Sequence, residues 1–174
     1  MRENIINLDL HGGDFAPLSV LEGARLAKSK YSHIKFQLHA TSECYNEHKK
    51  KYSDVFDKST WIEADNYISS EMKPSDALKK DFRNSSMSNA ISQLKDDKSQ
   101  IAISSGNTGA MMAYSTIYLR TVENITRPAI TSLFPSKKHP VCFLDLGANS
   151  ECTPENLVDF AIMGSTYYQV FYPE

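Results

Sequence analysis

The sequence predicts an α/β fold with a mainly parallel sheet that helices cover on both faces. Two observations predict it: short apolar runs alternate with helical patterns along the chain, and glycine turns follow three of these runs. Strands separated by helices form βαβ units, which set the strands parallel. The 174 residues suffice for a full core, so we expect one α/β domain over residues 1–174.

The first elements follow from local patterns. Residues 5–9 are an apolar run that predicts a strand, and residues 17–31 predict a helix with proline at its first position and an apolar stripe. Residues 34–40 alternate apolar and polar, as a strand does. Ser42 is the expected N-cap of a short helix that ends in the basic run 49–51.

The later elements are expected, in chain order, as a strand over 60–64, a helix over 87–94, a strand over 101–104, a helix over 108–122, strands over 129–134 and 141–146, and a last helix from Thr153 to about Tyr172. Residues 65–88 are the least regular stretch. The helix over 108–122 is apolar on all sides, which is typical of a buried or interfacial helix. Thr153 followed by Pro154 is a strong helix start.

Composition excludes several classes of protein. Lys plus Arg (19) and Asp plus Glu (21) nearly balance, so no global positive field favours nucleic acid. No apolar run approaches the roughly 18 residues of a membrane span. Residues 1–4 lead straight into the first strand without a secretory signal, and the three cysteines have no CxxC spacing. We expect a cytoplasmic protein with reduced thiols and no nucleic-acid partner.

Three glycine turns predict where chemistry occurs. They are residues 9–14, 104–109 and 145–149, and each lies between a strand and a helical pattern. Such turns offer backbone N–H groups and a helix N-terminus to an anion. Because ligands bind beyond the carboxyl ends of parallel strands, we expect the three turns to form one anion-handling cleft.

Each turn has candidate residues with two interpretations. In 104–109, the N–H groups around Gly106 and Gly109 and the side chains of Asn107 and Thr108 are donors for an anion; the alternative is a tight turn that needs glycine.

We expect Asp145 and Asn149 either to orient a substrate or to cap a helix. Asp9 and Asp14 position a hydroxyl or a cation, or else form an Asx turn and a helix cap, and as anions they are not direct phosphate ligands.

The cationic candidates lie in the irregular stretch. Lys79, Lys80 and Arg83 are the best partners for phosphate, since charge-assisted hydrogen bonds are strong; the alternative is a solvated helix face. Cys44 and His48 are four residues apart, but no further ligand cluster supports a metal site. Ser104 lacks the GxSxG context of a serine hydrolase.

Five blocks together resemble one family. They are Asp9-Leu-His-Gly-Gly-Asp14 with Pro17, Ser85-Ser-Met87, Ser104-Ser-Gly-Asn-Thr-Gly-Ala110, Leu144 to Asn149, and Phe160 to Ser165. In this order the sequence resembles the acyl-ACP:phosphate acyltransferases of bacterial phospholipid synthesis, the PlsX family. His11 stands where that family has methionine, so the resemblance gives it no catalytic role.

The resemblance implies a Rossmann-like three-layer α/β/α sandwich, related to phosphotransacetylases and isocitrate dehydrogenases. It implies transfer of a fatty acyl group from acyl carrier protein to inorganic phosphate, without a cofactor or metal, by a cytoplasmic homodimer that in some members associates with the membrane surface. The implied catalytic residues are Asn107, Thr108, Asp145 and Asn149. The implied substrate-binding residues are Asp9, Gly12, Gly13, Asp14, Lys80, Arg83, Ser104, Gly106 and Gly109.

The sequence also departs from the family. It resembles the N-terminal half only, since the later Asn-x-Gly-Glu-type and Asp-Gly-Phe-Thr-Gly-Asn segments are not in it. The alternatives to an acyltransferase are a truncated, catalytically inactive relative, or one half of a split enzyme that acts as a binding module. We expect little acyltransferase activity from this chain alone, since transition-state stabilisation needs a complete set of donors.

Overall fold

The computed structural model describes residues 5–96, 99 and 101–173. It divides into two compact units, one up to Leu119 and one from Arg120. Residues 1–4, which bear on the predicted lack of a leader, lie outside the described part. The expectation of one domain over residues 1–174 stays a prediction, and the two units are described separately below.

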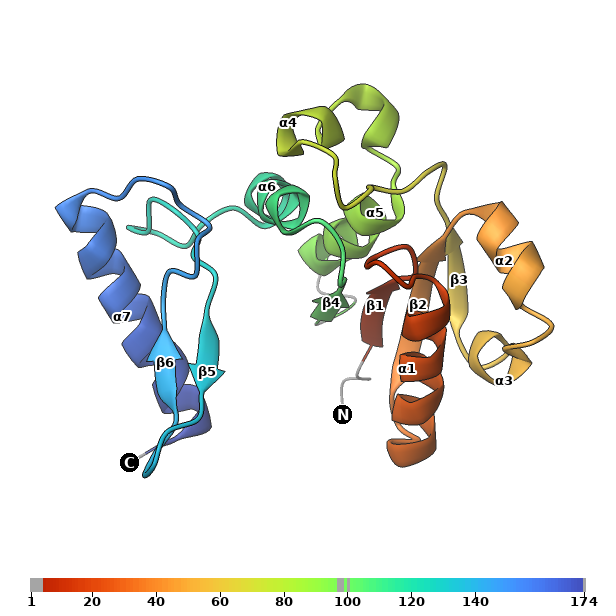
Figure 1. The fold of residues 1–174 in the computed structure, drawn as a ribbon, viewed down its shortest axis with the longest axis horizontal. Coiled ribbons are helices and arrows are strands. Elements are labelled where there is room, and N and C mark those ends of the chain that lie inside the picture. The colour runs from red at the N-terminus through yellow and green to blue at the C-terminus, as the bar shows by residue number, and fades with distance from the viewer. Residues whose placement is uncertain (1–4, 97–98, 100, 174) are drawn as a thin grey trace. The chain divides into compact units, whose positions relative to one another are not determined.

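The first unit contains a parallel sheet of four strands, which confirms the predicted α/β fold (Figure 1). The strands are β1 (Ile5–Asp9), β2 (Lys35–Ala40), β3 (Thr60–Glu63) and β4 (Ile101–Ile103), in the order β3-β2-β1-β4. Asn7 of β1 pairs with Gln37 on one side and with Ala102 on the other. The carboxyl ends of β1 and β4 therefore lie next to each other.

Helices cover both faces of this sheet, as the sequence predicts. The helical elements are α1 (Leu18–Lys30), α2 (Ser42–His48), α3 (Ser53–Phe56), α4 (Pro74–Ala77), η1 (Lys80–Phe82), α5 (Ser86–Ser92), η2 (Gln93–Asp96) and α6 (Thr108–Leu119). Leu8 and Leu38 face a core that includes Leu21 of α1. On the opposite face, Ala102 packs against a second core that contains residues of α4, α5 and α6. Burial of these two apolar clusters is the main force that holds the helices to the sheet.

Some local predictions for the first unit are wrong in detail. The N-cap of α2 is Thr41 and not Ser42, because the Thr41 hydroxyl accepts the N–H of Cys44 at 3.3 Å. Asp14 does not cap α1, whose N-cap is Pro17 without a side-chain cap. In the predicted apolar stripe of α1, Leu26 is exposed, whereas Leu21 is fully buried.

The second unit contains β5 (Ser132–Phe134), β6 (Val141–Phe143) and α7 (Pro154–Phe171). The two strands are shorter than predicted and pair antiparallel, because the link between them is too short for a crossover helix. Thr153 caps α7 as predicted: it accepts the Asn156 N–H, and the Asn156 side chain accepts the Thr153 N–H.

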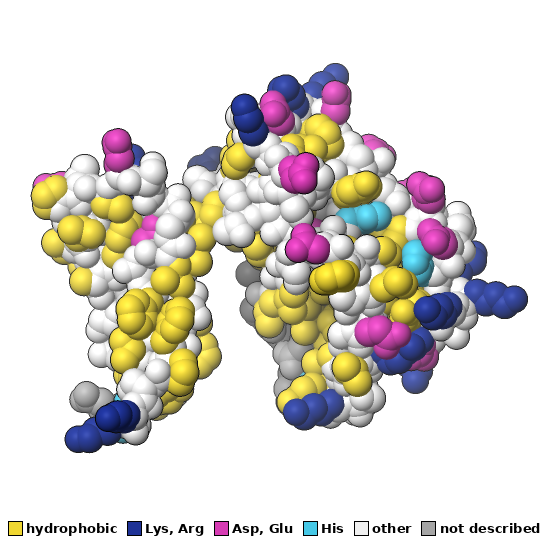
Figure 2. All heavy atoms as spheres, viewed as in Figure 1, with side chains coloured by type: hydrophobic (Ala, Val, Ile, Leu, Met, Phe, Trp, Pro, Cys, Tyr) yellow, Lys and Arg dark blue, Asp and Glu magenta, His cyan; other side chains and the backbone are white. Residues whose placement is uncertain are grey.

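Hydrophobic side chains gather on the surface of the second unit, over β5, β6 and α7 (Figure 2). The large exposed ones are Phe134, Val141, Phe143, Leu157, Val158, Ile162, Tyr167, Val170 and Phe171. A large exposed apolar patch of this kind marks an interaction surface. No helix in the described part of the chain has the length and the apolar character to cross a membrane.

Candidate functional site

The first two glycine turns meet at the carboxyl edge of the sheet, as predicted. A Cβ atom on Gly12 would overlap the hydroxyl of Ser104 and would lie 2.9 Å from the Ser105 nitrogen. A Cβ on Gly106 would lie 3.1 Å from the Gly12 Cα. Gly13 has a φ of 109°, which L side chains rarely adopt. Glycine is thus required for the two backbones to approach each other this closely.

Asp9 holds the two turns together. Its Oδ1 accepts the His11 N–H at 3.1 Å within the first turn, and its Oδ2 accepts the Ser104 hydroxyl at 2.7 Å from the second. The Ser104 oxygen in turn accepts the Gly106 N–H at 3.1 Å. The carboxylate is almost fully buried and engaged on both oxygens. It positions the two turns, and its predicted role as a substrate contact stays a prediction.

The Asn107 side chain connects this loop to an earlier segment. Its amide nitrogen donates to the carbonyl oxygens of Ser69, Ser70 and Met72, at 3.1, 3.3 and 2.6 Å, and its Oδ1 accepts the Ala110 N–H at 2.9 Å. The amide therefore caps α6 and anchors residues 69–72. The Asn107 amide, which the sequence suggested as a donor for a substrate, is therefore already used within the protein.

We expect Asn107→Ala to destabilise the first unit by about 1–2 kcal/mol, the usual cost of losing an N-cap. The substitution also leaves three carbonyl oxygens without this donor. Urea unfolding followed by circular dichroism measures the change. Thr116→Ala is the matched control, since the Thr116 hydroxyl is exposed and bonds only to the Met112 carbonyl of its own helix. Equal stability of the Asn107 and Thr116 variants would contradict this role.

The start of α6 is the part of the loop that remains open to a ligand. Thr108 is exposed, and the first N–H groups of a helix have no intrahelical acceptor. Among residues 5–96, 99 and 101–173, no acceptor is found for the N–H groups of Thr108 and Gly109. A Cβ on Gly109 would lie 2.5 Å from the Pro74 side chain, so glycine also lets residue 74 approach this end of the helix.

The basic residues that were predicted to bind phosphate are at the surface. Lys80 lies in η1 and Arg83 directly follows it, and both are exposed. Lys79 pairs with Asp76 at 2.8 Å. Asp14 is exposed as well. The structure brings none of these four residues into a described hydrogen bond with residues 104–109, so their roles as ligand contacts stay predictions.

His11 is a packing residue. Its ring stacks on Tyr67 with 4.7 Å between the ring centroids, and its Nε2 accepts the Thr41 N–H at 3.2 Å. Burial lowers the pKa of His11 more than the carboxylate of Asp9 raises it.

The described residues contain no group of three or more His, Cys, Asp or Glu side chains that could hold a metal ion. The Cys44–His48 pair forms a hydrogen bond within α2, from His48 Nδ1 to the Cys44 carbonyl at 3.0 Å.

The third turn, in the second unit, is built around one carboxylate. Asp145 accepts the N–H groups of Ile130, Ala148 and Asn149 at 2.9, 3.2 and 2.7 Å, and also the Asn149 side-chain amide at 3.0 Å. Partial burial raises the pKa of Asp145, but these hydrogen bonds outweigh it, and the net pKa lies below the ordinary value. The Asn149 amide also donates to the Pro128 carbonyl at 2.9 Å. Whether Gly147 lies beside the first two turns stays a prediction.

Two parts of this arrangement could not be predicted from the sequence. Residues 69–72, which hold Asn107, lie in the stretch without periodic pattern. The apolar cavity beside Ser104, described below, depends on Gly23, which lies inside a helix where the sequence showed only an apolar stripe.

The fold and this edge define an α/β protein with glycine turns built for close backbone approach. Residues 5–172 match the model of a family described as "Fatty acid synthesis protein", and the chain belongs to that family.

The chain is 41% identical over 165 residues to a phosphate acyltransferase from Ehrlichia ruminantium (strain Gardel), covering 93% of this chain and 48% of that protein. It is 39% identical over 170 residues to one from Wolbachia pipientis wMel, covering 95% and 49%. It is 34% identical over 165 residues to one from Phenylobacterium zucineum (strain HLK1), covering 95% and 47%. The chain thus spans about half the length of these curated relatives.

Proposed function

We propose that this chain carries the acyl-donor and phosphate sites of a phosphate acyltransferase in fatty acid and phospholipid synthesis. The observation that carries the proposal is the contact between the turns of Gly12 and Gly106, fixed by Asp9, at the carboxyl ends of adjacent parallel strands. Its relatives are named phosphate acyltransferases, which supports this reaction class.

In the proposed reaction, an oxygen of inorganic phosphate attacks the carbonyl carbon of an acyl thioester on acyl carrier protein. The C–S bond breaks, the thiol leaves, and an acyl phosphate forms. The protein's task is to place the two reactants and to stabilise the oxyanion that develops on the carbonyl oxygen. The free N–H groups of Thr108 and Gly109 and the Thr108 hydroxyl are suited to the anion. Asn107 acts by holding the loop that presents them.

The other predicted residues keep proposed roles. Lys80 and Arg83 attract phosphate from the surface, and Asp145 and Asn149 shape the third turn for substrate. The exposed apolar side chains of the second unit support the proposed homodimer, because large exposed apolar patches mark interaction sites. We propose a cytoplasmic protein that can lie at the membrane surface and needs no cofactor.

A phosphate titration of the isotopically labelled chain, followed by NMR, tests the anion site. We expect the N–H signals of residues 106–109 to shift with phosphate and not with chloride at equal ionic strength. Thr108→Ala should weaken phosphate binding about fivefold, since one hydrogen bond is worth about 1 kcal/mol. Thr116→Ala, at an exposed position about two helical turns further along α6, should leave phosphate binding unchanged. Unmoved signals at residues 106–109 would overturn the proposal.

A further inference from the structure

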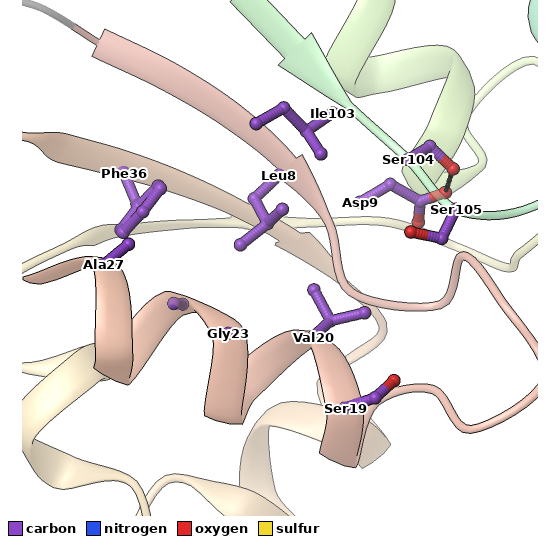
Figure 3. Close-up of a pocket in the computed structure, with 11 residues that line it drawn as sticks. Leu8, Asp9, Ser19, Val20, Gly23, Ala27, Phe36, Ile103, Ser104 and Ser105 are labelled. Atoms are coloured by element: carbon purple, nitrogen blue, oxygen red, sulfur yellow. Dashed lines mark hydrogen bonds between the residues drawn. The ribbon is translucent and has the colours of Figure 1, made fainter. Parts of the chain in front are cut away.

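A cavity of about 310 Å³ lies between α1 and the strands β1 and β4 (Figure 3). All of its lining belongs to the first unit. The apolar part of the lining consists of Leu8, Val20, Gly23, Ala24, Ala27, Phe36 and Ile103. Figure 3 shows Leu8 and Ile103 on the strand side and Val20, Gly23 and Ala27 on the facing surface of α1. Nothing charged lines this part, so it suits a hydrocarbon.

The polar part of the cavity coincides with the candidate site. Its remaining lining residues are Asp9, Ser19, Ser104 and Ser105. Of these, Ser104 and Ser105 are the residues that Gly12 approaches most closely. The cavity thus runs from the junction of the two glycine turns into an apolar space along α1. A ligand with a polar reacting end and an apolar tail matches this order of surfaces.

Gly23 keeps the helix side of the cavity open. It lies three residues from Val20 and four from Ala27, which places the three on one face of α1. A Cβ atom on Gly23 would meet no heavy atom within 4 Å, so neither packing nor chain approach requires glycine there. A glycine inside a helix weakens the helix relative to alanine. Gly23 is exposed and lines the cavity, so a larger side chain at this position would narrow the open space on the helix side.

We propose that this cavity binds the hydrocarbon chain of the acyl donor, with the thioester at the two glycine turns, and that Gly23 sets the length of chain that fits. This inference rests on the proposed function, which supplies an acyl group. An apolar cavity of roughly 150 Å³ accommodates benzene, so 310 Å³ accommodates about twice that, or roughly ten to twelve carbon atoms.

The test uses the 174-residue chain and acyl N-acetylcysteamine thioesters, which are neutral and contain no phosphate or carrier protein. Binding is measured by NMR and calorimetry for butanoyl to tetradecanoyl chains. We expect affinity to rise about fourfold with each added methylene and to level off near ten to twelve carbons. The signals of α1, β1 and β4 should shift.

Gly23→Leu should weaken binding of the decanoyl thioester at least tenfold and shift the plateau to shorter chains, because two excluded methylene groups alone correspond to about sixteenfold. Ser29→Leu is the matched control: it adds the same side chain to the same helix at an exposed position outside the cavity. Circular dichroism confirms that both variants fold.

Three outcomes overturn the inference: no binding, affinity independent of chain length, or equal affinity of the Gly23→Leu and Ser29→Leu variants. Length-dependent binding that Gly23→Leu blocks supports it, even if the phosphate titration fails. In that case the cavity is a hydrocarbon site and the proposed phosphate site at residues 106–109 is wrong. If phosphate binds and the thioesters do not, the inference about the cavity is wrong and the proposed phosphate site stands. Failure of the inference can thus be distinguished from failure of the proposed function.

Discussion

Lowering the pH from 7.5 to 4 should cost the first unit about 3 kcal/mol of stability through His39 alone. The ring is completely buried, and burial lowers the pKa of His39 to about 4 from the ordinary value of 6.5. The unfolded chain therefore takes up a proton between pH 6.5 and 4 that the folded chain does not. Stability is full above pH 6.5 and falls through this window, by about 1.4 kcal/mol for each pH unit.

The contacts of His39 explain why the folded state keeps the ring neutral. Its Nε2 lies 3.0 Å from the Asn7 Oδ1, and this amide oxygen can only accept, so Nε2 carries the proton. Its Nδ1 is buried and has no hydrogen-bond partner among the described residues. A second proton would therefore sit on a buried atom without an acceptor, which is strongly unfavourable.

Urea unfolding from pH 7.5 to 4.5 measures this effect in wild type and in His39→Gln, whose amide can still donate to Asn7. We expect the free energy of unfolding of the variant to depend less on pH than that of the wild type. The pKa of His11 is lowered as well, so His11 also makes the folded protein less stable as the pH falls. Only the difference between the wild-type and His39→Gln profiles is therefore assigned to His39. His33→Gln, at an exposed position, is the control and should keep the slope of the wild type. A His39→Gln profile as steep as that of wild type would refute the assignment.

The local sequence pattern predicted the strands of the parallel sheet well, because the burial of a strand determines which of its residues are apolar. The strand over 5–9 ends at the predicted residue, and Thr153 caps α7 as predicted. Turn chemistry likewise predicted that the glycine turns after β1 and β4 would lie at one edge. These features depend on neighbours in sequence and on the general rule for parallel strands.

The rest depends on contacts between distant residues, which no local pattern reports. The hydrogen bond from Ser104 to Asp9 spans 95 positions, and those from Asn107 to residues 69–72 span up to 38. The sequence showed Asn107 as an available donor, whereas the fold uses it to anchor a loop. The antiparallel pairing of β5 with β6 was missed for a related reason: apolar runs predict strands but not the direction in which they pair.

Replacing Gly12 tests the close approach on which the candidate site depends. In Gly12→Ala, the added methyl group would overlap the Ser104 hydroxyl and would lie 3.0 Å from the Asp9 Oδ2. Either the two turns separate or the hydrogen bond between Ser104 and Asp9 breaks. Overpacking of this kind costs up to about 3 kcal/mol, which urea unfolding measures. Loss of the Ser104–Asp9 contact should also move the NMR signal of the Gly106 N–H, which donates to Ser104.

Gly23→Ala is the matched control because it adds the same methyl group where the space is open. Within a helix, alanine in place of glycine should raise the free energy of unfolding by about 0.5–1 kcal/mol. The same substitution is thus expected to act with opposite sign at the two positions: the methyl group overlaps its neighbours at Gly12, whereas at Gly23 it meets open space and favours the helix. A Gly12→Ala protein as stable as wild type, with an unshifted Gly106 N–H, would mean that the two turns do not meet as described. The case for a single anion-handling edge would then be lost, because it rests on the contact between these two backbones.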